Sequence, residues 1–361
     1  MLIYFALLLV VTLSVYLSQK TSNAAARFFL YFVTFASLVL VSGLRDASVG
    51  TDAGSYVWTF QSISSLSDVR NASGEPGVPL LAWFGKLIYD NYVTLFTLVA
   101  TVVALCFLTG IRRLSLNPVV SVFVLLTAGI FYFSFNGMRQ GVAIAVLFLA
   151  IPFIYYRKLW AFLVCIAVAC FFHISAIMAL PVYFIVPRKN DFKYNALMFG
   201  VVVVSVLFFS ELVALAGRLN ARYLEYGAAV GQLSHGLAYA ASVVGIGLFF
   251  LYFRRYVEQH RDWYDLLLNL YLLGVVVTVV AVVRTTYVSG VMRMNAYFIT
   301  PQILLWPMVF ANLQGSRHRD LVRFAFVVLF LVYHGILLAR FSNLVPYSFN
   351  PLVRNGFRLL F

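Results

Sequence analysis

The chain has 361 residues, of which 63% are hydrophobic, 17% aromatic and only 11% charged, and its mean hydropathy is +0.94. A soluble domain of this size would expose too much apolar surface, so the composition excludes a soluble protein. The formal net charge is +14. The positive residues punctuate apolar segments and form no basic patch interleaved with aromatic residues. We therefore expect them to set membrane topology and meet anionic lipid headgroups, without a nucleic-acid partner.

Successive apolar runs of about 17 to 20 residues predict an all-α, polytopic integral membrane protein. The first run, from Met1 to Leu17, has neither a basic region before it nor a small-residue cleavage site, so we expect a retained helix. About twelve membrane helices are predicted, and in chain order they cover 1–17, 28–43, 92–110, 117–133, 140–156, 159–173, 174–186, 196–215, 236–253, 264–283, 294–311 and 321–339.

The segment 76–90 interrupts this series because it is apolar but short, with two prolines and Lys86. If it spanned the membrane, the basic loops after it would change sides. We therefore predict a re-entrant or interfacial helix on the external side. The polar stretch 44–75 before it and the segment 216–235 are predicted external loops, inserted in a single integral membrane domain that covers residues 1–361.

Lysine and arginine set the expected orientation. Most of the 26 lie in short connections that we therefore expect to be cytoplasmic, at 18–27, 111–116, 157–158, 187–195, 254–263 and 312–323. The N-terminus is then external. The other helix ends bring a second set of ionisable residues to the external face, namely Arg45, Asp52, Glu75, Arg139, His173, Arg284, Arg293 and Arg340. We interpret this convergence as one site.

The stretch from Phe131 to Tyr183 lies at the centre of the predicted site. Asn136 and Arg139 precede one apolar segment, and His173 ends the next. Ionisable groups at membrane depth are costly and usually face a cavity. Arg139 either extends to lipid headgroups or binds phosphate, which its planar fork of donors suits. His173 is either a satisfied structural residue or part of the site.

Two acidic positions have equally open interpretations. Asp52 either caps an external turn near a solvated Arg45 or supplies a carboxylate to the site. Glu75 starts the segment 76–90, where its charge suits the helix dipole. A partly desolvated glutamate would instead have a raised pKa and could act as a general base.

Three arginines lie near later helix ends. Arg284 and Arg293 bracket a short external turn, and either anchor the interface together with Tyr287 or accept an anionic ligand. Arg340 ends the last helix on the same side. No His or Cys has metal-ligand spacing to His173, and the three cysteines lie in apolar runs as packing residues, so we expect no metal and no cofactor.

Together these residues resemble the EpsG-like family of Wzy-type polysaccharide polymerases over nearly the whole chain. The matching stretches, in the family's order, are Gly43-Leu44-Arg45, Gly50-Thr51-Asp52, Tyr56, Glu75, Asn136-Gly137-Met138-Arg139-Gln140-Gly141, Phe172-His173-Ile174-Ser175-Ala176, Arg293-Met294-Asn295 and Pro346-Tyr347. The resemblance implies a bacterial inner-membrane enzyme with a GT-C-like helical fold. Such enzymes polymerise undecaprenyl-diphosphate-linked repeat units of O-antigen, capsule or exopolysaccharide at the periplasmic face.

In the reaction that the resemblance implies, a sugar hydroxyl attacks the anomeric carbon of the growing chain, and undecaprenyl diphosphate leaves, with inversion. We expect the base to be His173 first, then Glu75 or Asp52, since imidazole titrates near neutral pH and a carboxylate needs a raised pKa. The residues expected to bind diphosphate are Arg139, Arg284 and Arg293, then Arg45 and Arg340, with Asn136 beside them and with Tyr56, Trp58 and Tyr287 against sugar faces.

Rival functions remain open at this point. A flippase or transporter of the same lipid-linked oligosaccharide would also need a cationic cavity, but no inverted repeat is evident. An O-antigen ligase differs in its acceptor only, and a membrane O-acyltransferase would use similar residues. The expected partners are the lipid-linked oligosaccharide, the growing lipid-linked polysaccharide and membrane lipids, with a Wzz-type chain-length regulator by resemblance alone.

Overall fold

The computed structural model describes residues 1–72, 74–208, 211, 214–215, 233–283, 293–313, 319–340 and 343–360. Within these ranges the regular secondary structure is helical, apart from one isolated antiparallel bridge between Arg45 and Phe349. The prediction of an all-helical protein is therefore confirmed for the described part of the chain.

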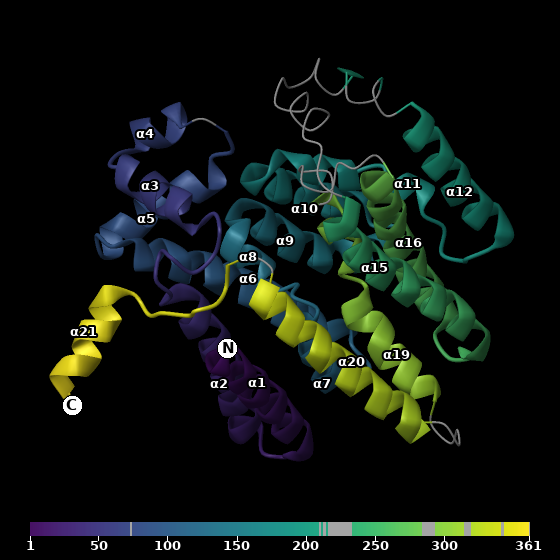
Figure 1. Cartoon of the computed structure of the whole chain (residues 1–361), viewed down its shortest axis with the longest axis horizontal. Coiled ribbons are helices and arrows are strands. Elements are labelled where there is room, and N and C mark those ends of the chain that lie inside the picture. The colour runs from purple at the N-terminus through teal and green to yellow at the C-terminus, as the bar shows by residue number, and fades with distance from the viewer. Residues whose placement is uncertain are drawn as a thin grey trace. The chain divides into compact units, whose positions relative to one another are not determined.

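The chain divides into two compact units (Figure 1). Unit 1 comprises Met1–Pro152, Trp160–Ile177 and Gln314–Phe361, and unit 2 comprises Phe153–Leu159 and Met178–Leu313. The helices that lie mainly in unit 1 are α1 (Leu2–Lys20), α2 (Ala24–Gly43), α3 (Ala53–Ser62), α4 (Leu66–Asn71), α5 (Gly77–Ile88), α6 (Tyr92–Leu114), α7 (Pro118–Thr127), α8 (Phe133–Asn136), α9 (Met138–Tyr155), α10 (Leu159–Phe172), η1 (Ile174–Ala179), α20 (Arg319–Arg340) and α21 (Pro351–Leu360). Those of unit 2 are α11 (Val182–Ile185), α12 (Phe192–Leu207), α15 (Leu233–Phe253), η2 (Arg254–Tyr256), α16 (Arg261–Val283), α18 (Ala296–Ile299) and α19 (Gln302–Asn312).

In the described ranges, 7 helical segments are long and apolar enough to cross a membrane. They are Leu2–Lys20, Ala24–Gly43, Tyr92–Leu114, Met138–Tyr155, Gly236–Tyr256, Arg261–Val283 and Arg319–Arg340. The protein is therefore a polytopic helical membrane protein. Shorter apolar helices occupy the remaining predicted spans that the structure describes, so the predicted count of twelve is not established.

Three predicted spans are interrupted. The span 117–133 ends as a helix at Thr127, because Gly129 adopts a left-handed φ of 76° that a helix does not continue through. The span 174–186 is a 3₁₀ turn followed by α11, which Pro181 caps. The span 294–311 is divided into α18 and α19, and Pro301 caps the second. Proline lacks the N–H that an uninterrupted helix needs.

The predicted loops differ in outcome. The stretch 44–75 folds into α3 and α4, and Ser65 and Asp68 cap α4 reciprocally, as a serine three residues before an acid does. The predicted helix in 76–90 is present as α5, whose 12 residues are too few to span a bilayer. The segment 216–235 lies mostly outside the described residues.

In unit 1, α2 packs between α1 and α6. Asn23 starts α2 by accepting hydrogen bonds from the amides of Ala25 and Ala26, which closes the α1–α2 hairpin. At the other end of α2, a Cβ on Gly43 would lie 2.8 Å from the Cα of Thr97, so glycine allows α2 and α6 to approach closely. Figure 1 shows α3, α4 and α5 together at the end of unit 1 away from the hairpin turn.

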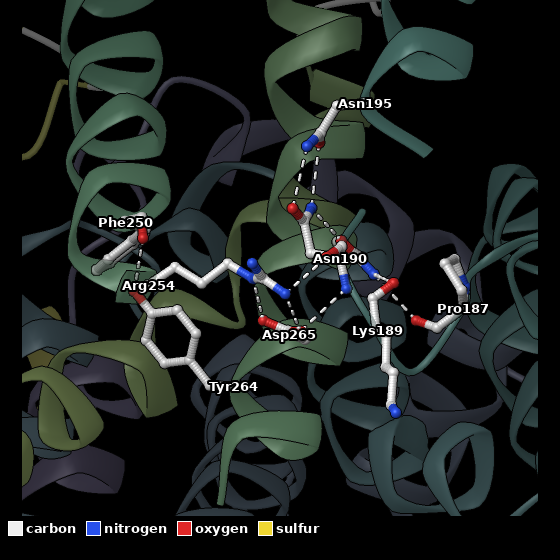
Figure 2. A network of polar contacts seen from close by, with 9 residues as sticks. Pro187, Lys189, Asn190, Asn195, Phe250, Arg254, Tyr264 and Asp265 are labelled. Atoms are coloured by element: carbon white, nitrogen blue, oxygen red, sulfur yellow. Dashed lines mark hydrogen bonds and ion pairs between the residues drawn. The ribbon is translucent and has the colours of Figure 1, made fainter. Parts of the chain in front are cut away.

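In unit 2, a buried polar network joins the segment before α12 to α16 (Figure 2). Arg254 donates to both oxygens of Asp265, at 2.6 and 2.7 Å, and to the Asn190 carbonyl at 2.6 Å. The Asn190 amide donates to Asp265 at 3.0 Å, and its side chain donates to Asn269 at 2.7 Å. Asp265 is 1% exposed, so these donors replace the water that would otherwise hydrate its carboxylate.

Replacement of Asp265 by Ala should lower the stability of unit 2 markedly. The change leaves Arg254 and the Asn190 amide without their acceptor. Removal of one partner of a buried ion pair lowers the free energy of unfolding by up to roughly 3 to 5 kcal/mol. The loss should be smaller here because Arg254 keeps 25% of its side chain exposed. The apparent melting temperature of the purified protein in detergent measures this loss. Asp262→Ala, an exposed acid on the same helix, is the matched control and should leave it unchanged; equal losses in both variants would contradict the role of the network.

Candidate functional site

A carboxylate, Glu75, lies at the turn between α4 and α5 with 8% of its side chain exposed. Gly74 before it has a φ of 105°, which glycine adopts without strain. A Cβ on Gly74 would also lie 3.0 Å from the Arg139 Nη1 atom. Pro76 after it caps α5. The Gly-Glu-Pro turn therefore places the carboxylate and leaves space for the guanidinium beside it.

Glu75 contacts groups from two separate helix ends. Its Oε2 atom accepts a hydrogen bond from Arg139 Nη1 at 2.9 Å. Its Oε1 atom accepts from the Ile174 amide at 3.0 Å and lies 3.0 Å from His173 Nδ1. We call Glu75, Arg139 and His173 the site cluster. It brings together three of the four residues that the sequence analysis singled out for catalysis.

His173 follows the last residue of α10, where the chain turns into η1. A Cβ on Gly77 would lie 2.5 Å from the Phe172 ring, so this glycine lets α5 pack directly on the end of α10. His173 Nδ1 is buried, and its contact with Glu75 is at ion-pair distance with a less favourable angle than a straight hydrogen bond. Nδ1 is therefore the ring nitrogen that faces the carboxylate of Glu75.

Arg139 lies in the first turn of α9, with 32% of its side chain exposed. Glu75 holds one end of the guanidinium, and the buried Tyr56 hydroxyl hydrogen-bonds with Arg139 from α3. His173 keeps 25% of its side chain exposed. The cluster therefore has a buried carboxylate, with a cation and an imidazole that an external ligand can still reach.

The electrostatics of Glu75 differ from the sequence-based expectation. Burial alone would raise the pKa of its carboxyl, but the His173 contact and the Ile174 amide lower the pKa further than burial raises it. The pKa lies well below the usual range of a glutamate, which contradicts the alternative in which desolvation raises it. Glu75 is ionised at neutral pH and has little basicity. Burial raises the pKa of Tyr56 despite the opposing effect of Arg139, so its hydroxyl stays neutral.

Arg45 is 1% exposed and serves the fold. Its guanidinium lies between the rings of Phe96 and Phe135, 4.2 and 4.3 Å from their centroids. It donates to the carbonyls of Ser42, Val49 and Phe135. Burial lowers the pKa of Arg45 to about 10, which keeps it protonated at neutral pH. Arg45 therefore has no exposed donor for the contact with a diphosphate that the sequence analysis expected.

Three other predicted residues lie near the start of α3. Asn136 accepts a hydrogen bond from the Thr51 amide at 2.6 Å, and thereby joins α8 to the turn before Asp52. Asp52 is the N-cap residue of α3 and acts electrostatically on Tyr56. Trp58 is 70% exposed and available to a ligand, whereas Tyr56 is 7% exposed and cannot stack on a sugar face.

The remaining predicted arginines are not brought to the site cluster by the described contacts. Arg340 is exposed at the end of α20 in unit 1. Arg293 is exposed in unit 2. Arg284 and Tyr287 lie outside the described residues. Their predicted contacts with a diphosphate or a sugar stay predictions.

The sequence analysis assigned no role to the segment 343–349, although its Pro346-Tyr347 motif is one of the stretches that resemble the EpsG-like family. The Asn343 carbonyl accepts from the Gly50 amide, and the Ser348 carbonyl accepts from the Asp46 amide, both at 2.9 Å. The Tyr347 hydroxyl donates to the Val41 carbonyl at 3.0 Å. This segment therefore holds the turn that leads into α3 and Tyr56.

The fold and the cluster define a class of protein: a polytopic helical membrane protein with a carboxylate–imidazole–guanidinium cluster at the ends of apolar helices. The sequence model of the EpsG family matches residues 28–349, and the chain belongs to that family. Membership indicates a membrane protein of the polysaccharide-polymerase type. No curated protein and no solved structure matches the chain.

Glu75→Gln should destabilise the protein in a pH-dependent way. A depressed pKa contributes stability that is fully present above the unfolded value, about 4.3, and is lost as the pH falls further. The difference in apparent melting temperature between wild type and variant should shrink as the pH falls below about pH 4.5. A difference that grows as the pH falls from about 4.5 to about 3 would contradict an ionised Glu75, and Asp90→Asn, an exposed carboxylate that follows α5, serves as the control.

Proposed function

We propose that this protein polymerises oligosaccharide repeat units carried on undecaprenyl diphosphate, at the periplasmic face of a bacterial inner membrane. The observation that carries the proposal is the contact of one buried carboxylate with both an imidazole and a guanidinium. Glycosyl transfer from a lipid diphosphate needs a proton acceptor and a cation at the leaving group. The site cluster holds these two groups side by side.

In the proposed step, His173 Nε2 takes the proton from a hydroxyl of the incoming repeat unit. The oxygen forms a bond to the anomeric carbon of the growing chain as the bond from that carbon to the diphosphate oxygen breaks. Glu75 keeps the imidazole oriented and stabilises the imidazolium that forms, as a carboxylate beside a catalytic histidine does. Direct displacement of this kind inverts the anomeric carbon.

Undecaprenyl diphosphate leaves with the electron pair of the broken bond. Arg139 is suited to this charge because its guanidinium presents paired donors and is partly buried, where charge–charge attraction is stronger than in water. A fixed guanidinium can stabilise a departing diphosphate without a metal ion. Glu75 offsets part of the positive charge of Arg139, so a diphosphate needs further cations, for which Arg284, Arg293 and Arg340 remain our proposals.

Two rival functions predict different products. A flippase of the same lipid-linked substrate needs a site that opens to each side in turn and no proton acceptor, so the positioned imidazole favours an enzyme. An O-antigen ligase uses the same chemistry with another acceptor. A Wzz-type chain-length regulator is a further proposed partner.

Arg139→Ala and His173→Ala should each abolish the polymer ladder. Loss of a general base typically slows a reaction about 10²- to 10⁴-fold, and loss of a charge-stabilising donor about 10²- to 10³-fold. The measurement is surface-polysaccharide length on a gel, in a deletion strain complemented with each variant, with protein abundance in the membrane measured in parallel.

Arg70→Ala, which removes an exposed arginine on α4, is the control and should restore a normal ladder. Single repeat units without a ladder identify a polymerase. Normal ladders in both site variants would overturn the assigned roles, and loss of single repeats as well would favour export or ligation.

A further inference from the structure

A pocket of about 560 Å³ lies at the end of unit 1 away from the site cluster. It is formed where the α1–α2 hairpin meets the last turn of α6, and its lining includes Ser18, Gln19, Arg27, Phe28, Tyr31 and Arg112. Volumes of about 300–1,000 Å³ are typical of small-ligand sites. Figure 1 shows the hairpin turn at the end of unit 1 opposite α3, α4 and α5.

The pocket is separate from the site cluster. The 20 residues of α2 run from Ala24 beside the pocket to Gly43 beside Arg45, and a helix of that length extends about 30 Å. The helix α6 packs on α2 and runs in the opposite direction, from Tyr92, whose hydroxyl accepts a hydrogen bond from the Ala47 amide, to Arg112 at the pocket. If the cluster faces one side of the membrane, the pocket faces the other.

The pocket carries unbalanced positive charge. Among the described residues, neither Arg27 nor Arg112 has a carboxylate partner or donates a side-chain hydrogen bond. The first acidic residue of the chain is Asp46, beyond the far end of α2, and residues 91–190 contain none. Both guanidinium groups are exposed at the rim. Two arginines facing one hollow without a counter-ion favour an anionic ligand, and their forked donors match phosphate.

The surroundings favour an anion that is part of a lipid. Phe28 is 74% exposed at the pocket, on a helix whose mean hydropathy of 2.0 marks it as a membrane span, and Tyr31 follows one turn later. An apolar ring and a tyrosine at a helix end lie where acyl chains meet headgroups. Basic pockets between membrane helices bind lipid headgroups for this reason.

We propose that this pocket binds the phosphate of an anionic membrane lipid, with Arg27 and Arg112 as its two cationic contacts. The exposed Gln19 amide can donate to the headgroup oxygens, and Phe28 lies along the acyl chain. Bilayer phospholipid and a polyprenyl phosphate carrier share this chemistry. The proposal is independent of the polymerase reaction.

The test measures lipid binding to the full-length protein, delipidated in a nonionic detergent. Phosphatidylglycerol is titrated and detected by native mass spectrometry. The Arg27→Gln/Arg112→Gln variant should bind about 30-fold more weakly, since each basic residue near a lipid headgroup contributes about one kilocalorie per mole. The matched control, Lys20→Gln/Arg113→Gln, removes two cations from the same end of the unit outside the pocket lining and should bind as wild type does.

Equal weakening in both double variants would overturn the proposal, because it would indicate general surface charge. Competition by inorganic phosphate as strong as that by phosphatidylglycerol would overturn the lipid assignment. Tighter binding of undecaprenyl phosphate, lost in the same variant, would support the site and identify the carrier as its source. Arg27→Lys/Arg112→Lys keeps both charges and should bind phosphatidylglycerol with an affinity between those of wild type and the Arg27→Gln/Arg112→Gln variant. If this folded variant bound no better than the Gln variant, the role of the two positive charges would be contradicted.

Discussion

The constraint on which unit 1 depends is the burial of Arg45, which has no carboxylate partner among the residues that the structure describes. A buried cation is tolerated only where other groups replace its hydration, and here two aromatic faces and three backbone carbonyls do so. These groups come from the end of α2, the turn at 46–50, α6 and α8. Since α8 leads into Arg139 and the turn leads into α3 with Tyr56, Arg45 fixes the elements that present the site without contributing to its chemistry.

Glu75 contacts both the imidazole of His173 and the guanidinium of Arg139. Its burial alone would favour the neutral acid. Hydrogen bonds from Arg139 and the Ile174 amide, together with the nearby imidazole of His173, keep it ionised. An ionised carboxylate orients an imidazole and a guanidinium at once, which a neutral acid would do weakly.

Much of the fold could be predicted because membrane helices follow from length and apolarity: α1, α2, α6, α16 and α20 lie within a few residues of expectation. The break at Gly129 could not be predicted, since a glycine within a continuous apolar run does not reveal its left-handed φ. For the site, Arg139, His173 and Glu75 were identified by residue type. The expected topology also placed all three at one face. Their direct contact through Glu75 could not be predicted, because Glu75 lies 64 and 99 residues from Arg139 and Ile174. The error on the pKa of Glu75 has the same origin: burial can be guessed locally, whereas donors from distant elements cannot.

The arginines of unit 1 illustrate why charge at helix ends cannot be assigned a role from sequence position alone. Arg45, Arg139 and Arg27 each lie near the end of an apolar helix, but the first is 1% exposed, the second keeps 32% of its side chain exposed and the third lies at an open rim. Full burial commits every donor to the protein, so the group stabilises the fold. Partial burial with a carboxylate fixes a guanidinium while leaving donors for a ligand. An exposed guanidinium without a counter-ion can bind the anionic headgroup of a membrane lipid. The extent of desolvation therefore separates three environments of one residue type within a single unit.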